Sequence, residues 1–303
     1  MSADQTDLVV AIVSWNVREL LDQCLGALWP ALENAAITSE VWVVDNASTD
    51  GSVTWVRDRH PWVRVVASPE NLGFVRANNI LLDRYQDSAR YIWLLNPDTV
   101  VHPAAVGHLL EFLDRHPQAG LIGPKLLNTD GTLQESAFGF PGLLQALFAL
   151  GLMPARLYHT RLNGRYTPQL YAQPAPFPVD HPLGAAMMVR GEAVRDVGLL
   201  DERYFMYCEE IDWAWRMQRA GWERWLIPAA EVVHVGGAST RQAKPETTGH
   251  LWVSRARLYR THRPRLEAAV TGLAVRAVFR HHLVRADSDA WRLAYSRILE
   301  AWR

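Results

Sequence analysis

The sequence has only two cysteines in 303 residues, Cys24 and Cys208, which lie far apart and form no CxxC pair. This spacing excludes a disulfide framework and gives no support for a structural zinc site. No run of eighteen apolar residues occurs, so no segment is predicted to cross a membrane as a helix. The first seven residues are polar and acidic, unlike the basic start of a signal peptide. These absences predict a protein of the reducing cytoplasm.

Two glycine-rich phosphate-binding motifs are also absent. GxGxxG does not follow the first predicted strand, and GxxxxGK[ST] does not occur anywhere in the chain. Their absence argues against a dinucleotide-dependent dehydrogenase and against a P-loop enzyme. The formal net charge of -1 gives no overall bias, and no nucleic-acid partner is expected.

The chain does contain a regular alternation of strand-like and helix-like segments. Apolar, β-rich runs occupy residues 8–13, 41–44, 63–66, 91–95, 120–124 and 232–235. Helical patterns follow the first, third and fourth runs, and Pro103 is predicted to occupy the first position of a helix. This alternation predicts an α/β fold with a mainly parallel sheet and right-handed crossovers.

Polar residues follow the predicted strands at the points where the strands end. They are Ser14, Asn16, Asp45, Asn71, Asn96 and Asp98. Each of them alone could merely cap a helix or close a turn. Parallel strands, however, bring their carboxyl ends to one edge of the sheet, where open α/β sheets bind ligands. The sequence therefore predicts a binding site at this edge.

A second polar region occurs late in the chain. Glu209, Glu210 and Asp212 fall in the first turn of a predicted helix, among aromatic residues and next to Cys208. They could bind a substrate, or they could simply complement the helix dipole. His234 lies within the last predicted strand and could be a core residue or a ligand. The Gly-Gly-Ala-Ser-Thr segment at 236–240 resembles an anion-binding loop.

Seven segments of the chain carry a family resemblance. They are Val-Ser-Trp-Asn at 13–16, Val-Asp-Asn-Ala-Ser-Thr-Asp-Gly at 44–51, Asn-Leu-Gly-Phe at 71–74, Asn-Pro-Asp at 96–98, Gly-Ala-Ala-Met-Met at 184–188, Glu-Glu-Ile-Asp at 209–212 and His234. In this order they resemble the family 2 glycosyltransferases with the GT-A fold, particularly bacterial rhamnosyltransferases of cell-surface polysaccharides. The match covers roughly residues 8–240.

The resemblance implies a Rossmann-like nucleotide-binding sheet flanked by helices, with a C-terminal helical extension. A GT-A catalytic domain would span residues 1–254, with a nucleotide-sugar-binding half at 1–128 and an acceptor-binding half at 129–254. Residues 255–303 would form a basic helical extension. The implied activity is inverting, metal-dependent transfer from a nucleotide diphosphate sugar, with dTDP-L-rhamnose a first candidate, to a saccharide or lipid-linked acceptor. The alternatives are a catalytically altered nucleotide- or glycan-binding member and a nucleotidyltransferase.

The resemblance also implies roles for individual residues. Asp45 matches the acid that recognises the pyrimidine base, and Ser14, Asn16, Asn71 and Asn96 belong to the nucleotide site. Asp98 matches the last Asp of the metal-binding DXD motif, whose first Asp is replaced here by Asn96. His234 matches a further ligand of Mg²⁺ or Mn²⁺. Glu210 matches the acceptor base, with Glu209 as the alternative, and the acceptor contacts would be Gly184, Ala185, Asp212 and Trp213.

The C-terminal extension combines positive charge with an apolar pattern. Residues 255–303 hold eleven arginines against four acidic residues, which predicts an anionic partner. Leu266, Ala269, Val270, Leu273, Ala277 and Arg280 recur at helical spacing, near Arg263, Arg265, Arg276 and Arg285. This face could pack on the catalytic domain, pair with a second subunit in a homodimer, or bind the inner face of the cell membrane. The apolar residues 143–153 leave a similar choice between packing and membrane contact.

Overall fold

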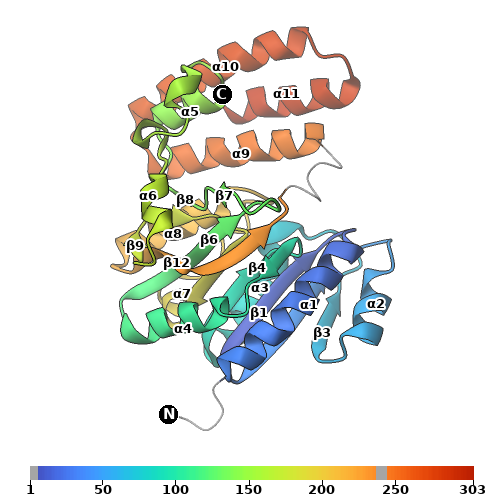
Figure 1. The fold of residues 1–303 in the computed structure, drawn as a ribbon. Coiled ribbons are helices and arrows are strands. Elements are labelled where there is room, and N and C mark those ends of the chain that lie inside the picture. The colour runs from blue at the N-terminus through green and yellow to red at the C-terminus, as the bar shows by residue number, and fades with distance from the viewer. Residues whose placement is uncertain (1–5, 237–243) are drawn as a thin grey trace.

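Figure 1 shows the computed structural model of the chain, which describes residues 6–236 and 244–303. The strands are β1 (Thr6–Ser14), β2 (Ser39–Asp45), β3 (Val63–Ala67), β4 (Ala89–Leu95), β5 (Thr99–Val101), β6 (Ala119–Leu127), β7 (Leu133–Gln134), β8 (Ala137–Phe138), β9 (Phe177–Pro178), β10 (His181–Pro182), β11 (Ala186–Arg190) and β12 (Glu223–His234). The α-helices are α1 (Arg18–Ala35), α2 (Ser52–Arg59), α3 (Gly73–Tyr85), α4 (Ala105–Arg115), α5 (Leu143–Ala149), α6 (Pro168–Ala172), α7 (Gly191–Val197), α8 (Glu209–Arg219), α9 (Lys244–His262), α10 (Arg265–Val284) and α11 (Asp289–Ala301). None of the helices in these ranges combines the length and apolar content needed to cross a bilayer.

The central sheet of the described residues is mixed but mainly parallel. Its order is β3-β2-β1-β4-β11-β6-β12-β5, with β7 paired to β6 and β9 paired to β12. The pairs β3/β2, β2/β1, β1/β4 and β6/β12 are parallel, whereas β11 runs antiparallel to both β4 and β6. β3, β2, β1, β4, β6 and β12 therefore point the same way and end at one edge, which confirms the predicted α/β architecture.

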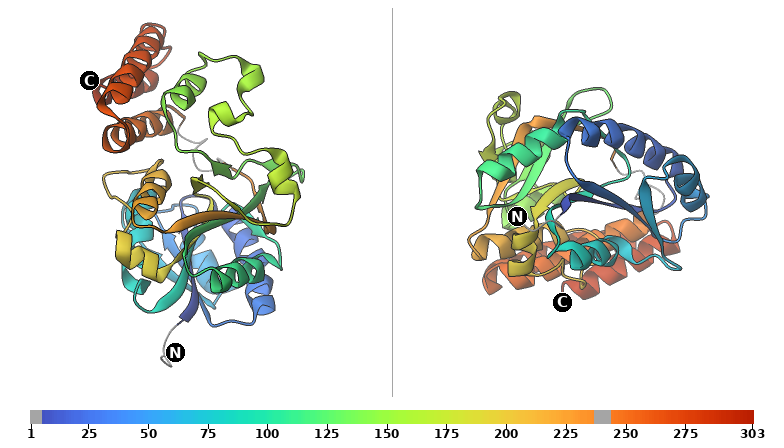
Figure 2. Two further views of the ribbon diagram at one scale, coloured as in Figure 1. Left: turned by 90° about the vertical axis from the view of Figure 1, so that its left-hand side faces the viewer. Right: turned by 90° about the horizontal axis from the view of Figure 1, so that it is seen from below.

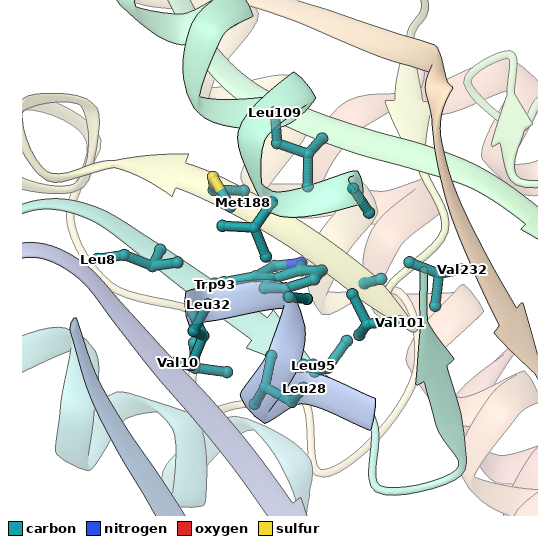
Figure 3. Close-up of a cluster of buried hydrophobic side chains, with 14 of the residues drawn as sticks. Leu8, Val10, Leu28, Leu32, Trp93, Leu95, Val101, Leu109, Met188 and Val232 are labelled. Carbon is teal, nitrogen blue, oxygen red and sulfur yellow. The ribbon is translucent and has the colours of Figure 1, made fainter. Parts of the chain in front are cut away.

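Both faces of the sheet are covered by helices, which explains why the strands read as unbroken apolar runs. On one face, Leu8 and Val10 of β1 and Trp93 of β4 pack against α1 and α4. Figure 3 shows Trp93 in this cluster, with the helix residues closing over it. On the other face, Val9 and Ala11 of β1 pack with residues of α3, α7 and α8.

The helices α9, α10 and α11 form a separate layer at the end of the molecule opposite the N-terminus (Figure 1). They share their own apolar core, which includes Trp252, Val275 and Ile298, and α5 lies against α10 (Figures 1 and 2). Hydrogen bonds attach this layer to the rest of the chain: the Tyr259 hydroxyl donates to the Gly142 carbonyl at 2.6 Å. The predicted division between residues 254 and 255 falls inside α9, and this division stays a prediction.

Some predicted boundaries were wrong. α4 begins at Ala105, not at Pro103, because residues 102–105 first form a turn in which Ala105 N–H donates to the His102 carbonyl at 2.9 Å. The strand predicted at 120–124 spans 119–127, and the one predicted at 232–235 spans 223–234. The central strand β11 and the edge strand β5 were not predicted from the sequence.

Candidate active site

A cavity of about 280 Å³ lies at the edge of the sheet where the parallel strands end. The residues predicted from the sequence that line it are Ser14, Asn71, Asn96, Asp98, Gly184, Ala185, Glu209, Glu210 and His234. The register explains why they meet. β1 pairs with β4, and β11 pairs with the other side of β4, where the Asn96 amide donates to the Ala185 carbonyl at 2.8 Å. Residues nearly ninety positions apart therefore share one wall.

Asp98 and His234 face each other across the pairing of β5 with β12. His234 Nε2 lies 3.3 Å from Asp98 Oδ1, and both side chains are buried. His234 Nδ1 is 2.7 Å from Gln134 Oε1, and the Gln134 amide nitrogen donates to Asn128 Oδ1 and to the His234 carbonyl. Because Gln134 Oε1 can only accept, Nδ1 is the donor, so Nε2 carries the lone pair whenever the ring is neutral.

This arrangement has the donor set that a divalent cation needs from a sparse protein site. The buried His234 Nε2 has no hydrogen-bond partner among the described residues, although Asp98 lies nearby. A carboxylate oxygen and a neutral imidazole, the latter fixed by an outer amide, suit Mg²⁺ or Mn²⁺ when ligand oxygens complete the coordination. No group of three or more His, Cys, Asp and Glu side chains that could hold a metal is found in residues 6–236 and 244–303.

Glu209 and Glu210 open onto the same cavity from the first turn of α8. One oxygen of each carboxyl group is buried without a hydrogen-bond partner among the described residues. Burial raises the pKa of Glu210 to about 7. Burial also raises the pKa of Glu209 well above its usual value, and the neighbouring charge of Glu210 adds to this shift. The two carboxyl groups cannot both ionise easily at neutral pH.

Of the residues predicted to bind the nucleotide at the ends of β1 and β2, Ser14 lines the cavity, whereas Asn16 and Asp45 do not. Ser14 and Asp45 are direct neighbours across the two strands, and both are buried. Asp45 Oδ2 accepts from the Ser48 amide at 2.9 Å, whereas Asp45 Oδ1 and Ser14 Oγ have no hydrogen-bond partner among the described residues. Buried polar atoms of this kind usually find their partner in a ligand or water. Asn16 lies beside this pair, and its Oδ1 accepts from the Thr49 amide at 2.8 Å.

The segment Asn71-Leu72-Gly73-Phe74 joins the nucleotide side to the loop before α8. Asn71 Oδ1 accepts from the Gly73 amide at 2.9 Å, and the Phe74 amide donates to the Phe205 carbonyl at 3.1 Å. Gly73 has φ +77°, and a Cβ there would lie 2.6 Å from that carbonyl oxygen. Only glycine therefore permits this close approach.

The loop before α8 is held in a costly backbone conformation. Tyr207 and Cys208, neither of them glycine, have φ values of 69° and 68°. Such left-handed residues cost about 1 kcal/mol each, and they persist where the surrounding structure holds them. Here they direct the start of α8, and with it Glu209 and Glu210, toward the cavity, which Tyr207 also lines.

The predicted acceptor residues divide into two pairs. Gly184 and Ala185 line the cavity, and a Cβ on Gly184 would lie 3.8 Å from Glu210 Cβ. Asp212 and Trp213 do not line it. Trp213 is fully buried and its indole N–H donates to the Gly198 carbonyl at 2.9 Å.

Asp212 forms part of the attachment between α8 and α9. Its Oδ1 accepts from His262 Nε2 at 2.7 Å, and its Oδ2 accepts from Arg216 Nε at 2.8 Å. Burial favours the neutral acid, but these two hydrogen bonds outweigh that effect and lower the pKa of Asp212. The His262 ring stacks on Trp215 at 4.5 Å. Asp212 therefore links α9 of the helical layer to α8.

Sequence reasoning missed three residues that shape the cavity. Asn46 lines it and holds the 71–74 segment, because its Nδ2 donates to the Gly73 carbonyl at 3.1 Å. Its place directly after Asp45 could have indicated this. No sequence pattern indicated Gln134 or Tyr207, because their positions depend on contacts with residues that are distant in the sequence. The predicted anion loop at 236–240 lies outside the described residues from position 237 onward.

The chain is similar to known glycosyltransferases in sequence. Residues 9–168, just over half of the chain, match the family described as glycosyl transferase family 2. The chain is 31% identical over 242 residues to N-acetylglucosaminyl-diphospho-decaprenol L-rhamnosyltransferase of Mycobacterium tuberculosis, which covers 77% of each chain. It is 25% identical over 231 residues to a low-salt glycan biosynthesis hexosyltransferase of Haloferax volcanii, which covers 75% of this chain and 67% of that protein.

The fold is similar to that of a solved structure that contains a nucleotide and a sugar. A crystal structure of GalNAc-T7 with UDP, GalNAc and Mn²⁺ superposes with a TM-score of 0.56 at 14% identity. The superposition covers 77% of this chain and 44% of that longer chain, and at this identity it supports the GT-A fold alone. Together with the family match and the relative at 31% identity, these findings show that the chain belongs to glycosyl transferase family 2 and is a glycosyltransferase.

Proposed function

We propose that the protein transfers a sugar, with inversion, from a nucleoside diphosphate sugar to a lipid-linked saccharide in the cytoplasm, as a step of cell-surface polysaccharide synthesis. The observation that carries this proposal is the cavity shared by Ser14, Asn71 and Asn96, by the Asp98–His234 pair and by the two glutamates. dTDP-L-rhamnose is the first donor to test, because the mycobacterial relative is named as an L-rhamnosyltransferase acting on a diphospholipid-linked sugar.

The nucleotide half of the proposed site is the end of β1 and β2. The unpartnered Asp45 Oδ1 and Ser14 Oγ suit the N–H and polar groups of a pyrimidine nucleoside, with Asn16 and Asn71 beside them. Asn96 directly precedes the Asp98 turn and lines the path from nucleoside to diphosphate. This assignment corresponds to the predicted nucleotide-sugar-binding half at residues 1–128, with Gly184 and Ala185 in the acceptor half at 129–254.

Asp98 and His234 would hold a divalent cation, Mg²⁺ or Mn²⁺. When bound, the cation would neutralise charge that develops on the departing diphosphate. The role of Gln134 is to keep the His234 ring oriented with Nε2 toward Asp98, through the 2.7 Å hydrogen bond to Nδ1. With only these two side chains as ligands, diphosphate oxygens and water would complete the coordination.

Glu210 is the proposed general base. Its carboxylate takes the proton of the acceptor hydroxyl while that oxygen forms a bond to the anomeric carbon. The bond between the anomeric carbon and the diphosphate oxygen breaks on the opposite face, and the nucleoside diphosphate leaves with the electron pair. Attack opposite the leaving group inverts the anomeric configuration.

The different burial of the two glutamates favours Glu210 over Glu209 as the base. Glu209 is more deeply buried, and its pKa is raised further when Glu210 is ionised. At neutral pH, Glu210, with a pKa of about 7, is partly ionised, and Glu209 gives up its proton less readily. A neutral Glu209 would also reduce repulsion of a second negative charge in the cavity.

A panel of nucleotide sugars with a diphospholipid-linked acceptor tests the activity. We expect product with one donor, dTDP-L-rhamnose first, and an inverted anomeric configuration by NMR. A protein that binds a nucleoside diphosphate but transfers no sugar from any donor would instead be the catalytically altered family member. Retention of configuration would refute the single-displacement chemistry.

The metal assignment needs a readout other than turnover. Calorimetry of nucleoside diphosphate binding with and without Mn²⁺ should show that the ion strengthens binding to the wild type. In Asp98→Asn this enhancement should be lost, because a carboxylate oxygen becomes a neutral amide. An Asp98→Asn variant that keeps the full enhancement would refute the assignment.

A further inference from the structure

The face of α10 that points away from its own core is unusually apolar. Leu266 is 77% exposed, Val270 41% and Leu273 60%, although all three recur at helical spacing. The opposite face of α10 packs into the core it shares with α9 and α11. We call Leu266, Val270 and Leu273 the apolar stripe. Contiguous exposed apolar residues of this kind mark interaction surfaces more often than scattered ones do.

A cavity of about 500 Å³ borders the apolar stripe and is lined by arginines. Arg260, Arg263, Arg265 and Arg276 line it, and Leu273 of the stripe forms part of its wall. No Asp or Glu side chain of the described residues lines this arginine pocket. Arg260 donates to the main-chain oxygens of Ala301 and Arg303, and Arg276 donates to that of Trp302. Arg263 Nε lies 3.9 Å from Glu267 Oε1, and this carboxylate offsets only part of the charge of the arginines that line the pocket.

The segment around α5 lies beside the first turn of α10 and also carries exposed apolar residues. The Leu143 amide donates to Glu267 Oε1 at 2.9 Å, so α5 starts beside the first turn of α10. Leu144, the next residue, is exposed, as are Leu152 and Leu162 further along. Figure 1 shows α5 and α10 on the far side of α9 from the central sheet, in contact with each other.

We propose that the apolar stripe and the arginine pocket form a docking surface for an anionic phospholipid bilayer. The stripe would enter the boundary between headgroups and acyl chains, and the pocket would take up headgroup phosphates. A second copy of the chain fits this surface less well, because a two-fold contact would bring two arginine pockets together. The proposal goes beyond the transfer reaction and depends on neither the donor, the metal nor the base.

Vesicle co-sedimentation of the full chain tests the proposal. Binding to vesicles containing phosphatidylglycerol should exceed binding to pure phosphatidylcholine and should weaken at high salt. Arg260→Ala/Arg265→Ala, which removes two exposed arginines of the pocket, should weaken binding about 25-fold, at roughly fivefold per charge. Leu266→Ser/Leu273→Ser should weaken it at least about tenfold, since two leucines no longer insert.

Leu293→Ser is the matched control, because Leu293 is also exposed on a helix, α11, but lies outside the stripe. It should leave vesicle binding unchanged. Equal binding to both vesicle types, or wild-type binding by both double variants, would overturn the proposal. The proposal would also be overturned if the protein bound no vesicles but formed a dimer, and if the stripe variant dissociated that dimer. Should the stripe variant fail to fold, the arginine variant tests the same surface. Turnover of a water-soluble acceptor, if the proposed function is right, should survive both substitutions.

Discussion

Replacing Glu210 with glutamine tests the reaction and the electrostatics of the cavity together. Glu210→Gln keeps the size of the side chain but removes the proton acceptor. Loss of a general base typically lowers the rate by about 10²–10⁴-fold. Donor binding, measured by calorimetry with the nucleoside diphosphate, should not change, because Glu210 lies at the start of α8 and not on the nucleotide side.

The wild-type enzyme should show the corresponding pH dependence. With a pKa of about 7, the ionised fraction of Glu210 falls about tenfold per pH unit below neutrality, and kcat/KM should fall with it. Stability should change in the opposite direction. A pKa raised above the unfolded value contributes stability at low pH that is lost as the pH rises through about 7. Moving a carboxyl pKa from 4.5 to about 7 corresponds to about 3 kcal/mol as an upper limit.

Glu210→Gln should therefore be more stable than the wild type at pH 8 and similar to it at pH 4, as measured by denaturant unfolding. Glu209→Gln is the control for activity, and it should keep most of the transfer rate. An inactive Glu209→Gln beside an active Glu210→Gln would move the base by one residue. A kcat/KM without an acidic limb near pH 7 would refute the ionisation argument.

Three further substitutions probe the supports of the site. Gln134→Ala removes the acceptor that orients the His234 ring. Calorimetry should therefore show that the gain in nucleoside diphosphate affinity caused by Mn²⁺ falls about tenfold. The affinity without metal should not change. Gly73→Ala places a Cβ 2.6 Å from the Phe205 carbonyl oxygen, on a backbone with φ +77°. Thermal unfolding should show that the free energy of unfolding falls by about 1–3 kcal/mol. Gly26→Ala is the control and should not be destabilised, because there is open space around Gly26. Asp212→Asn should lower the free energy of unfolding by about 3 kcal/mol near pH 7. The difference from the wild type should disappear as the pH falls through the lowered pKa of Asp212. Unfolding curves recorded near pH 7 and at acidic pH would check this. No destabilisation in either of the last two variants would contradict the packing described.

Much of the proposed nucleotide side could be predicted from the sequence because its signals are local. An apolar run followed by Asn-Pro-Asp specifies both the strand β4 and the polar turn beyond it, and parallel pairing then brings Ser14 and Asp45 to the same edge. The first turn of α8 was likewise visible in the helical spacing after Glu209.

The rest could not be predicted, because it depends on pairings between distant segments. Nothing local places β11 antiparallel beside β4, yet this pairing brings Ala185 next to Asn96. Gln134 reaches His234 only because β7 pairs with β6 and β12 lies next to β6. Pro103 shows that helix boundaries are hard to predict from sequence. Proline is favoured at the first position of a helix, but here Pro103 lies in a turn and the helix begins at Ala105.

The C-terminal extension shows most clearly which features the sequence predicts and which only the tertiary structure decides. The sequence by itself predicted a helical, arginine-rich extension with helical spacing from Leu266 to Arg280, which falls within α10, because periodicity and charge are properties of neighbouring residues. It could not decide which face packs, because α10 has apolar residues on more than one side. The tertiary structure buried Val275 and Phe279 against α9 and α11 and left Leu266 and Leu273 in solvent. Which face of a helix is buried is set by the surfaces that meet it, and those come from elsewhere in the chain.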